Sequence, residues 1–183
     1  MSKPIIDIMN QKFILELNAA LAMENAGIER LQTRIEEVSL PEAKQQLEHH
    51  LEESLEHQKN LEQIISSIGG EPTQEKLGLP LPSYPPEMKA MMDKSMTKQE
   101  YELKRTEEDM IVENAEVCCY LMMIQKCQMA GGVYANAIGP LSKIMNDEQE
   151  QADWIKTHSP GMLAQLWPKI QSAVAANAPP FSL

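Results

Sequence analysis

The spacing of apolar residues predicts four long amphipathic helices, because side chains three and four positions apart share one face of a helix. The first is predicted from about Ile5 to Val38, the second from Pro41 to Ile68, the third from Thr97 to Met129 and the fourth from Val133 to His158. A shorter terminal helix is expected after Ser159-Pro160. The 183 residues are therefore expected to form an all-helical domain with a substantial core.

Capping and turn residues mark the ends of these helices. Ser39 can cap the second helix and Pro41 can open it, because proline is tolerated in a first helical turn. Thr97 and Glu100 form a T-x-x-E capping box at the start of the third helix. Glycine pairs end the second and third helices, and Gly139-Pro140 predicts an irregularity in the fourth.

A long segment, residues 70–96, joins the second and third helices and contains five prolines. One short helix is predicted inside it, from about Glu87 to Asp93. Two helical hairpins joined by a single long connection are typical of the ferritin-like topology of four-helix bundles. We therefore expect a ferritin-like four-helix bundle over residues 1–158, followed by a C-terminal helix and tail over residues 159–183.

Composition supports helices and narrows the range of partners. Leu, Glu, Gln, Ala, Met and Lys are abundant, whereas aromatic residues make up only 4% of the chain. A net charge of −11 without a basic patch argues against nucleic-acid binding. No segment approaches the roughly 20 apolar residues of a membrane span, and the N-terminus lacks a signal-peptide pattern. We expect a cytoplasmic protein that binds neither nucleic acid nor membrane.

The sulfur-containing residues admit two interpretations each. Three cysteines lie in one apolar helical stretch without metal-type or disulfide spacing: Cys118, Cys119 and Cys127. We interpret them as reduced, inert core residues, because reactive cysteines need an electropositive setting and this stretch is acidic and apolar. Four methionines gather before the third helix: Met88, Met91, Met92 and Met96. Gap-filling or a dimer contact explains them better than soft copper binding.

Polar residues interrupt the apolar stripe of the fourth helix. This stripe consists of Leu141, Ile144, Glu148, Gln151 and Ile155, so a carboxylate and an amide occupy two positions where a core helix carries apolar side chains. Burying an unpaired carboxylate is very costly. Either this helix is turned away from the core, or a buried group requires Glu148.

The other three helices show the same intrusion on their inner faces. In the first helix Glu24 lies in line with leucine and isoleucine positions. The stripe of the second helix begins His50, Ser54, His57, with Glu53 on its flank. The third helix places acids and a tyrosine along one face: Glu113, Glu116 and Tyr120. Each helix therefore offers at least one acid near its inner face, and the second adds imidazoles.

Several carboxylates converging in a core would repel one another strongly, and a pair of divalent cations removes that repulsion. Carboxylate and imidazole ligands suit iron or manganese. Dinuclear sites in helical bundles use one Glu from each of two helices and a Glu-x-x-His from each of the other two. Here Ser54-x-x-His57 and Glu148-x-x-Gln151 depart from that pattern, and glutamine is a poorer ligand than histidine. The pattern predicts two divalent ions, iron or manganese, as cofactors.

Four segments in order resemble known ferritin-like proteins. "DEQEQADWI" resembles the last-helix motif of that superfamily, and "LNAALAMENAGIE" the first-helix motif of bacterioferritins. The closer resemblance is to the YciF-like family, a ferritin-like group: "HLEESLEHQKNLEQI" and "VENAEVCCY" are similar to its H-L-E-E-T and V-E-H-x-E-I-A-A-Y segments. The resemblance covers about Leu15 to Ile155.

The resemblance implies a metal-ligand set. Carried over by position, the ligands of the family fall on Glu24, Glu53, Glu116 and Glu148, with His57, Glu113 and His50 as further candidates. Asn114 stands where the third-helix motif often has histidine, and Gln151 replaces the ferritin histidine. Apart from the resemblance, Tyr120 has two interpretations: it donates a hydrogen bond to Glu116, or it is a core tyrosine whose hydroxyl has another partner. The resemblance also implies a homodimer and a stress-related setting.

Three functions remain open at this point. The first is a dinuclear redox protein that handles oxygen or peroxide, as an oxidase, a ferroxidase or a peroxidase or catalase-like enzyme. The second is a non-catalytic metal-binding protein, favoured by Ser54 and Gln151 because they thin the ligand set. The third is a metal-free helical scaffold or dimerisation module, in which Glu24 and Glu148 pair with Lys or Arg and His50 and His57 are hydrogen-bonded core residues.

Overall fold

The computed structural model describes residues 3–177 of the chain, with side chains described from residue 8 to residue 176. Residues 3–177 are 86% helix and contain no strand. The prediction of an all-helical protein is confirmed. No helix within residues 3–177 combines the length and the apolar character needed to cross a membrane.

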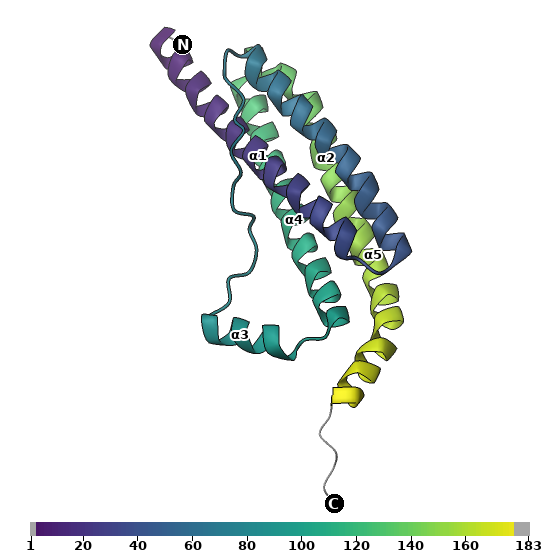
Figure 1. Cartoon of the computed structure of the whole chain (residues 1–183). Coiled ribbons are helices and arrows are strands. Elements are labelled where there is room, and N and C mark those ends of the chain that lie inside the picture. Colours follow the sequence, from purple (N-terminus) through teal and green to yellow (C-terminus); the bar gives the residue numbers. More distant parts are fainter. Residues whose placement is uncertain (1–2, 178–183) are drawn as a thin grey trace, which may run out of the picture.

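Four long helices lie side by side as two antiparallel hairpins (Figure 1). The first hairpin pairs α1 (Lys3–Glu37) with α2 (Pro41–Ser67). The second pairs α4 (Lys98–Ala130) with α5 (Ile138–Asn177), through the 3-10 turn η1 (Gly132–Ala137). Helix α1 also contacts α4, and α2 contacts α5, so the hairpins pack against each other along two seams.

The crossover between the hairpins contains the short helix α3 (Pro86–Ser95), as predicted. Its first part is fixed to α1, because the Leu77 amide donates to the Ala22 carbonyl at 2.9 Å and the Thr73 amide donates to Asn18 Oδ1 at 2.7 Å. Helix α3 has no buried residue and lies beside the bundle (Figure 1), where the Tyr101 hydroxyl of α4 donates to its Asp93. Gap-filling in the core is therefore wrong for Met88, Met91 and Met92, whereas a dimer contact stays a prediction.

The caps of the helices follow the sequence with one exception. Thr97 and Glu100 form the expected capping box, with both of its hydrogen bonds present, and Pro41 opens α2. The Ser39 cap is wrong: the N-cap residue of α2 is Leu40, and the Ser39 hydroxyl donates to Glu102 Oε2 at 2.7 Å. Ser39 therefore ties the α1–α2 loop to α4 instead of capping its own helix.

The predicted break after His158 is wrong, because α5 continues through Pro160 and Pro168 to Asn177. A proline inside a helix removes one backbone hydrogen bond. The three residues before Pro160 add side-chain hydrogen bonds to the carbonyls four positions back: Thr157 to Asp153, His158 to Trp154 and Ser159 to Ile155. The start of this helix is also later than predicted, because residues 132–137 form η1.

Two apolar clusters fix the ends of the hairpins. The larger contains Leu17 of α1, Leu61 of α2 and Ile144 of α5, together with α4 residues that follow Tyr120. In the smaller, Met162 and Leu166 of α5 pack on Leu40 and Ala43 at the start of α2. The extended part of α5 thus covers one end of the hairpins (Figure 1). Along α2, α4 and α5, the buried polar residues come between these two clusters.

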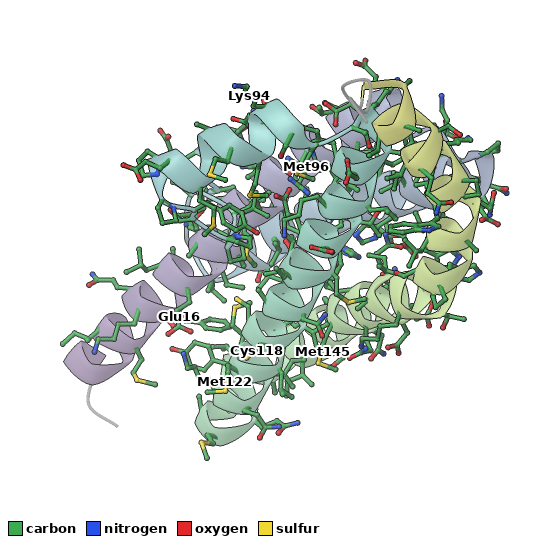
Figure 2. The ribbon with its side chains drawn as sticks, turned by 90° about the horizontal axis from the view of Figure 1, so that it is seen from below. Glu16, Lys94, Met96, Cys118, Met122 and Met145 are labelled. Atoms are coloured by element: carbon green, nitrogen blue, oxygen red, sulfur yellow. The ribbon has the colours of Figure 1, made fainter. Side chains whose placement is uncertain are left out.

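The three cysteines are free thiols, but they do not share one environment. Cys127 is buried in the larger cluster, as expected for a core residue. Cys118 is exposed on the outer side of α4, close to the exposed Met122 (Figure 2), so the core interpretation is wrong for it. Burial raises the pKa of the Cys119 and Cys127 thiols, which keeps both protonated and poorly reactive.

Candidate metal centre

The middle of the molecule contains a cluster of buried polar side chains from all four long helices. None is more than 4% exposed: Glu24 from α1, His50, Ser54 and His57 from α2, Glu113 and Glu116 from α4, and Glu148 and Gln151 from α5. The inward stripes predicted for the four helices are thus confirmed. Ionisable groups are almost never fully buried unless they are paired or bind a metal, so this cluster needs a chemical explanation.

One group of possible ligands consists of Glu24, His57 and Glu148, with ligand atoms within 4.8 Å of one another. His57 Nδ1 lies 2.9 Å from Glu148 Oε1 and 3.7 Å from Glu24 Oε1. The other ring nitrogen, His57 Nε2, lies 2.9 Å from Asp147 Oδ2. Asp147 therefore holds the imidazole so that Nδ1 faces the two glutamates.

A second group consists of His50, Glu113 and Glu148, again within 4.8 Å. His50 Nε2 lies 3.2 Å from Glu113 Oε2 and 3.3 Å from Glu148 Oε2. His50 Nδ1 lies 3.3 Å from Glu53 Oε2, which fixes this ring as Asp147 fixes the other. Glu148 belongs to both groups and directs one carboxylate oxygen to each.

Four buried atoms of this cluster lack a hydrogen-bond partner among the residues that the structure describes: His57 Nδ1, Glu113 Oε2 and both carboxylate oxygens of Glu148. Their neighbours are close, but the directions do not suit hydrogen bonds. A buried polar atom without a partner is destabilising by about 1–3 kcal/mol. All four atoms are the kinds that bind divalent metal ions, so the residues present fit a metal.

The two histidines are held in their charged form. Burial acts to lower the pKa of His57, but close contacts with Glu148 and Glu24 outweigh it and raise that pKa to about 10. Burial likewise opposes the charge on His50, and its contacts with Glu113 and Glu148 raise its pKa well above the usual value. Burial opposes the charge on Glu148 too, but the two imidazoles bring its pKa below the usual range.

The remaining acids are held towards their neutral form. Burial is the main cause for Glu24 and Glu116, whose pKa values are raised, and it raises the pKa of Glu113 to about 8. Charge repulsion from Glu148 adds to the rise in all three. Without a metal, the cluster thus keeps its charges low by retaining protons on histidines and acids alike.

Five of the seven predicted ligands fall in the two groups: Glu24, His50, His57, Glu113 and Glu148. Glu116 is buried among them but belongs to neither group. The placement of Glu53 as a primary ligand is not supported, because its partly exposed side chain contacts His49 and His50 from outside the groups.

The two supporting residues also have other partners than expected. The Tyr120 hydroxyl donates a hydrogen bond to Glu24 Oε1, so the predicted bond to Glu116 is wrong. Tyr120 nevertheless contacts a member of the first group from behind. Gln151 is buried, and its Oε1 accepts from Gln46 Nε2 at 2.8 Å. Its amide oxygen is thus engaged in a bond across the α2–α5 seam.

Sequence reasoning missed Asp147 and a buried ion-pair cluster next to the site. Asp147 precedes Glu148 and is one turn from Lys143, so it looked like a surface residue. Asp109 pairs with Arg30 at 2.7 Å and with Arg34 at 2.9 Å, joining α1 to α4. Extending the α4 stripe from Glu113 back by four positions would have found Asp109, because both lie on the same helix face.

Comparisons with known proteins place the fold. A protein from Xanthomonas campestris pv. campestris has a similar structure, with a TM-score of 0.71 and 16% identity over 88% of this chain and 98% of that one. YcfI from Rhodopseudomonas palustris is also similar, with a TM-score of 0.64 and 18% identity over 81% of this chain and 93% of that one. Among curated proteins, none matches this sequence. Residues 9–166 match the family described as Domain of unknown function (DUF892), and this chain therefore belongs to the DUF892 family.

Proposed function

We propose that this protein is a ferritin-like four-helix-bundle protein that binds two divalent metal ions, iron or manganese, and reacts with oxygen or peroxide in a stress-related setting. The observation that carries the proposal is Glu148, a fully buried carboxylate with one histidine on each side and, among the described residues, no hydrogen-bond partner for either oxygen. A carboxylate in that position is suited to bridging two cations.

The two ligand groups suggest which residues would bind each ion. Glu24 and His57 would hold one ion, Glu113 and His50 the other, and Glu148 both. Glu116, buried beside them, offers a further carboxylate. Asp147 and Glu53 would orient the two imidazoles through their outer ring nitrogens, and Tyr120 would hold Glu24 in place. When bound, iron or manganese would supply the redox chemistry for reducing oxygen or peroxide.

The charges of the cluster support a pair of divalent ions. The carboxylates of Glu24, Glu113, Glu116 and Glu148 together carry four negative charges when ionised, which two divalent cations balance with both imidazoles neutral. In the metal-free state, protons on the histidines provide part of that balance. Metal binding would release these protons, because a ligating imidazole must be neutral.

The arrangement of the helices also supports the ferritin-like assignment. Two antiparallel hairpins connected by one long crossover have the connectivity of such bundles, and their metal sites lie between facing helices. The two similar solved structures share this fold at low identity and say nothing of the reaction. The support for a reaction with oxygen or peroxide therefore comes from the residues of the cluster alone.

Metal content tests the proposal. The protein is reconstituted with iron(II) or manganese(II) without oxygen and desalted, and bound metal per chain is measured by elemental analysis. We expect two ions per chain in the natural protein and none, or one weakly held ion, in Glu148→Gln. Glu150→Gln on the exposed face of the same helix is the matched control and should retain both ions. A chain that retains no metal, or Glu148→Gln with full occupancy, would overturn the proposal.

A non-catalytic metal-binding role is the second candidate, and one observation favours it. Gln151, which stands at the position of the ferritin histidine, is tied to Gln46, and Ser54 lies in the second-helix stripe where an acid is expected. Each ion would then have few protein ligands. Oxygen or peroxide consumption by the metal-loaded protein separates the two: turnover supports the redox role, and bound metal without turnover supports storage or sensing.

A homodimer is proposed as the assembly, in line with the YciF-like resemblance. The exposed apolar side chains of Ile111, Leu163 and Trp167 on α4 and α5 are the kind that a second copy could cover. Sedimentation equilibrium of the metal-free and metal-loaded protein would measure the assembly directly. A monomer at high concentration would contradict it without affecting the metal proposal.

A further inference from the structure

Gly27 lies in the middle of α1, directly beside the metal cluster, although packing does not require glycine there. Apart from its chain neighbours and the nearby backbone of α1, a Cβ at this position would meet one atom within 4 Å, Glu116 Oε1 at 3.9 Å. That distance is ordinary van der Waals contact. Glycine in a helix interior is destabilising relative to alanine. The absence of a side chain therefore leaves the backbone open above the Glu116 carboxylate at a cost in stability.

A small cavity of about 20 Å³ lies beneath Gly27, between α1 and α4. Its lining includes Gly27, Glu24, Glu113, Glu116 and His50, so it reaches members of both ligand groups. A cavity of this size has room for one water-sized particle. The cavity thus lies between Gly27, at the α1–α4 seam, and the two ligand groups.

Side-chain contacts close two other seams beside the cluster, between α2 and α5 and between α1 and α2. Across the α2–α5 seam, Asp147 contacts His57 at 2.9 Å and Gln46 bonds to Gln151 at 2.8 Å. At the α1–α2 seam, Asn25 accepts from Gln58 and donates to a carbonyl of the crossover. Further along the α1–α4 seam, Arg30 is bound to Asp109. Between the Tyr120–Glu24 and Arg30–Asp109 bonds, the residues that the structure describes place no further side-chain bond across the α1–α4 seam at Gly27.

The inner wall of this seam carries acids that can bind a cation when they release their protons. Glu116 is 4% exposed and makes no hydrogen bond within the part of the chain that the structure describes. Glu113 Oε2, also on the cavity wall, is one of the buried atoms without a hydrogen-bond partner. Once ionised, carboxylates on such a wall attract cations. The same wall also carries Arg30, whose charge is paired with Asp109 at 2.7 Å.

We propose that divalent metal ions reach the cluster through the α1–α4 seam at Gly27, with Glu116 as the first buried carboxylate they meet. The proposal rests on the proposed metal-binding function and adds the route. It also gives Gly27 a role, as the open point of the seam, and gives Glu116 a role, as the first carboxylate on the route. Neither residue belongs to the two ligand groups. Because a route affects only how fast ions pass, blocking it should change the rates of loading and release but not the affinity.

Rates of metal loading test the route. Iron(II) is mixed anaerobically with metal-free protein, and a chromophoric chelator traps the unbound ion at timed intervals; the loaded protein is then stripped with excess chelator. We compare the natural chain with Gly27→Ala and Gly27→Leu. Gly161→Leu is the matched control, because Gly161 is also inside a helix with no atom within 4 Å of its added Cβ. Circular dichroism checks that each variant is folded.

We expect Gly27→Leu to slow loading and release by the same factor, about tenfold or more, with an unchanged number of ions at equilibrium. Gly27→Ala should load nearly as fast as the natural chain, and Gly161→Leu equally fast. Natural rates in Gly27→Leu would overturn the route, and so would slower loading by Gly161→Leu. A change in affinity with unchanged loading would also overturn it. Failure of the natural chain to bind iron would instead overturn the proposed function.

Discussion

Glu148 shows how much a single residue can reveal in this protein. Its position in an apolar stripe identified it from sequence, and its burial between two histidines is confirmed. Sequence could also place His50, His57 and Glu113 on inner faces, because helical periodicity is local. It could not choose among Glu53, His57 and His50 as the second-helix ligand, because Glu53 flanks the stripe of the two histidines and the choice depends on the rotation of α2.

The histidine charges predict how the stability of the metal-free protein depends on pH. The pKa of His57 is raised from 6.5 to about 10 in the folded protein. The folded state therefore holds this proton more tightly, so the stabilisation is fully present below pH 6.5 and is lost as pH rises through 10. Glu113, with its pKa raised from 4.5 to about 8, changes stability in the same direction over its own range.

We therefore expect the free energy of unfolding of the metal-free protein to fall between pH 6.5 and 10, by up to about 1.4 kcal/mol per pH unit for His57, with Glu113 adding to the fall only up to about pH 8. Urea unfolding at a series of pH values, in the presence of a chelator, measures this slope. His57→Gln should reduce it. A stability that is flat or rises over this range would contradict the charged state assigned to His57.

At the scale of the helices, the crossings between hairpins decide which groups meet. The pairs α1–α2 and α4–α5 follow from the short loops that join them. The contact of α1 with α4 depends on tertiary packing, and the Asp109 carboxylate between Arg30 and Arg34 is its main polar tie. The same seam brings Gly27 to Glu116, a contact between residues far apart in the sequence.

Helix stability offers a direct check on the reason for Gly27. We expect Gly27→Ala to raise the free energy of unfolding by about 1 kcal/mol, because alanine is the better helix former and its Cβ meets no neighbour closer than 3.9 Å. Chemical denaturation of the metal-free protein measures this change. Gly161→Ala, at an open helical position, provides the comparison. Destabilisation specific to Gly27→Ala would mean that close packing, not access, requires the glycine.

At the scale of the whole molecule, the two apolar clusters enclose a polar layer that contributes little favourable burial of its own. Buried charges of this kind are weakly stabilising at best unless they are fully paired. A ligand that pairs with them should therefore stabilise the folded chain. The third function considered, a metal-free scaffold, makes the opposite prediction.

Metal should raise the melting temperature of the protein. An ion that binds only the folded state stabilises by about 2.7 kcal/mol at a free concentration of 100 times its Kd, which corresponds to roughly 5–10 °C for a chain of this length. Calorimetry with manganese(II), and again after chelation, measures the shift. Magnesium(II) at equal concentration controls for general ionic effects. Equal melting temperatures in all conditions would favour the scaffold.

The sequence by itself determined the helices, their inward stripes and the types of residue that meet at the centre. These features depend on helical periodicity, which is a property of short stretches of sequence. That periodicity was enough to place five residues on inner helix faces: Glu24, His50, His57, Glu113 and Glu148. Local signals were weaker at helix ends, so the continuation of α5 past Pro160 was missed. There, hydrogen bonds from neighbouring side chains and packing on Leu40 and Ala43 outweigh the preference of proline to end a helix.

Only the tertiary structure decided which atoms face each other. The Tyr120 hydroxyl meets Glu24 and not Glu116, Asp147 holds His57, and Glu53 stays outside the two groups. Each outcome depends on how far neighbouring helices are rotated and shifted along their axes. Those rotations and shifts are set by the packing of both apolar clusters, which involves residues from every long helix at once. No single stretch of sequence contains that information.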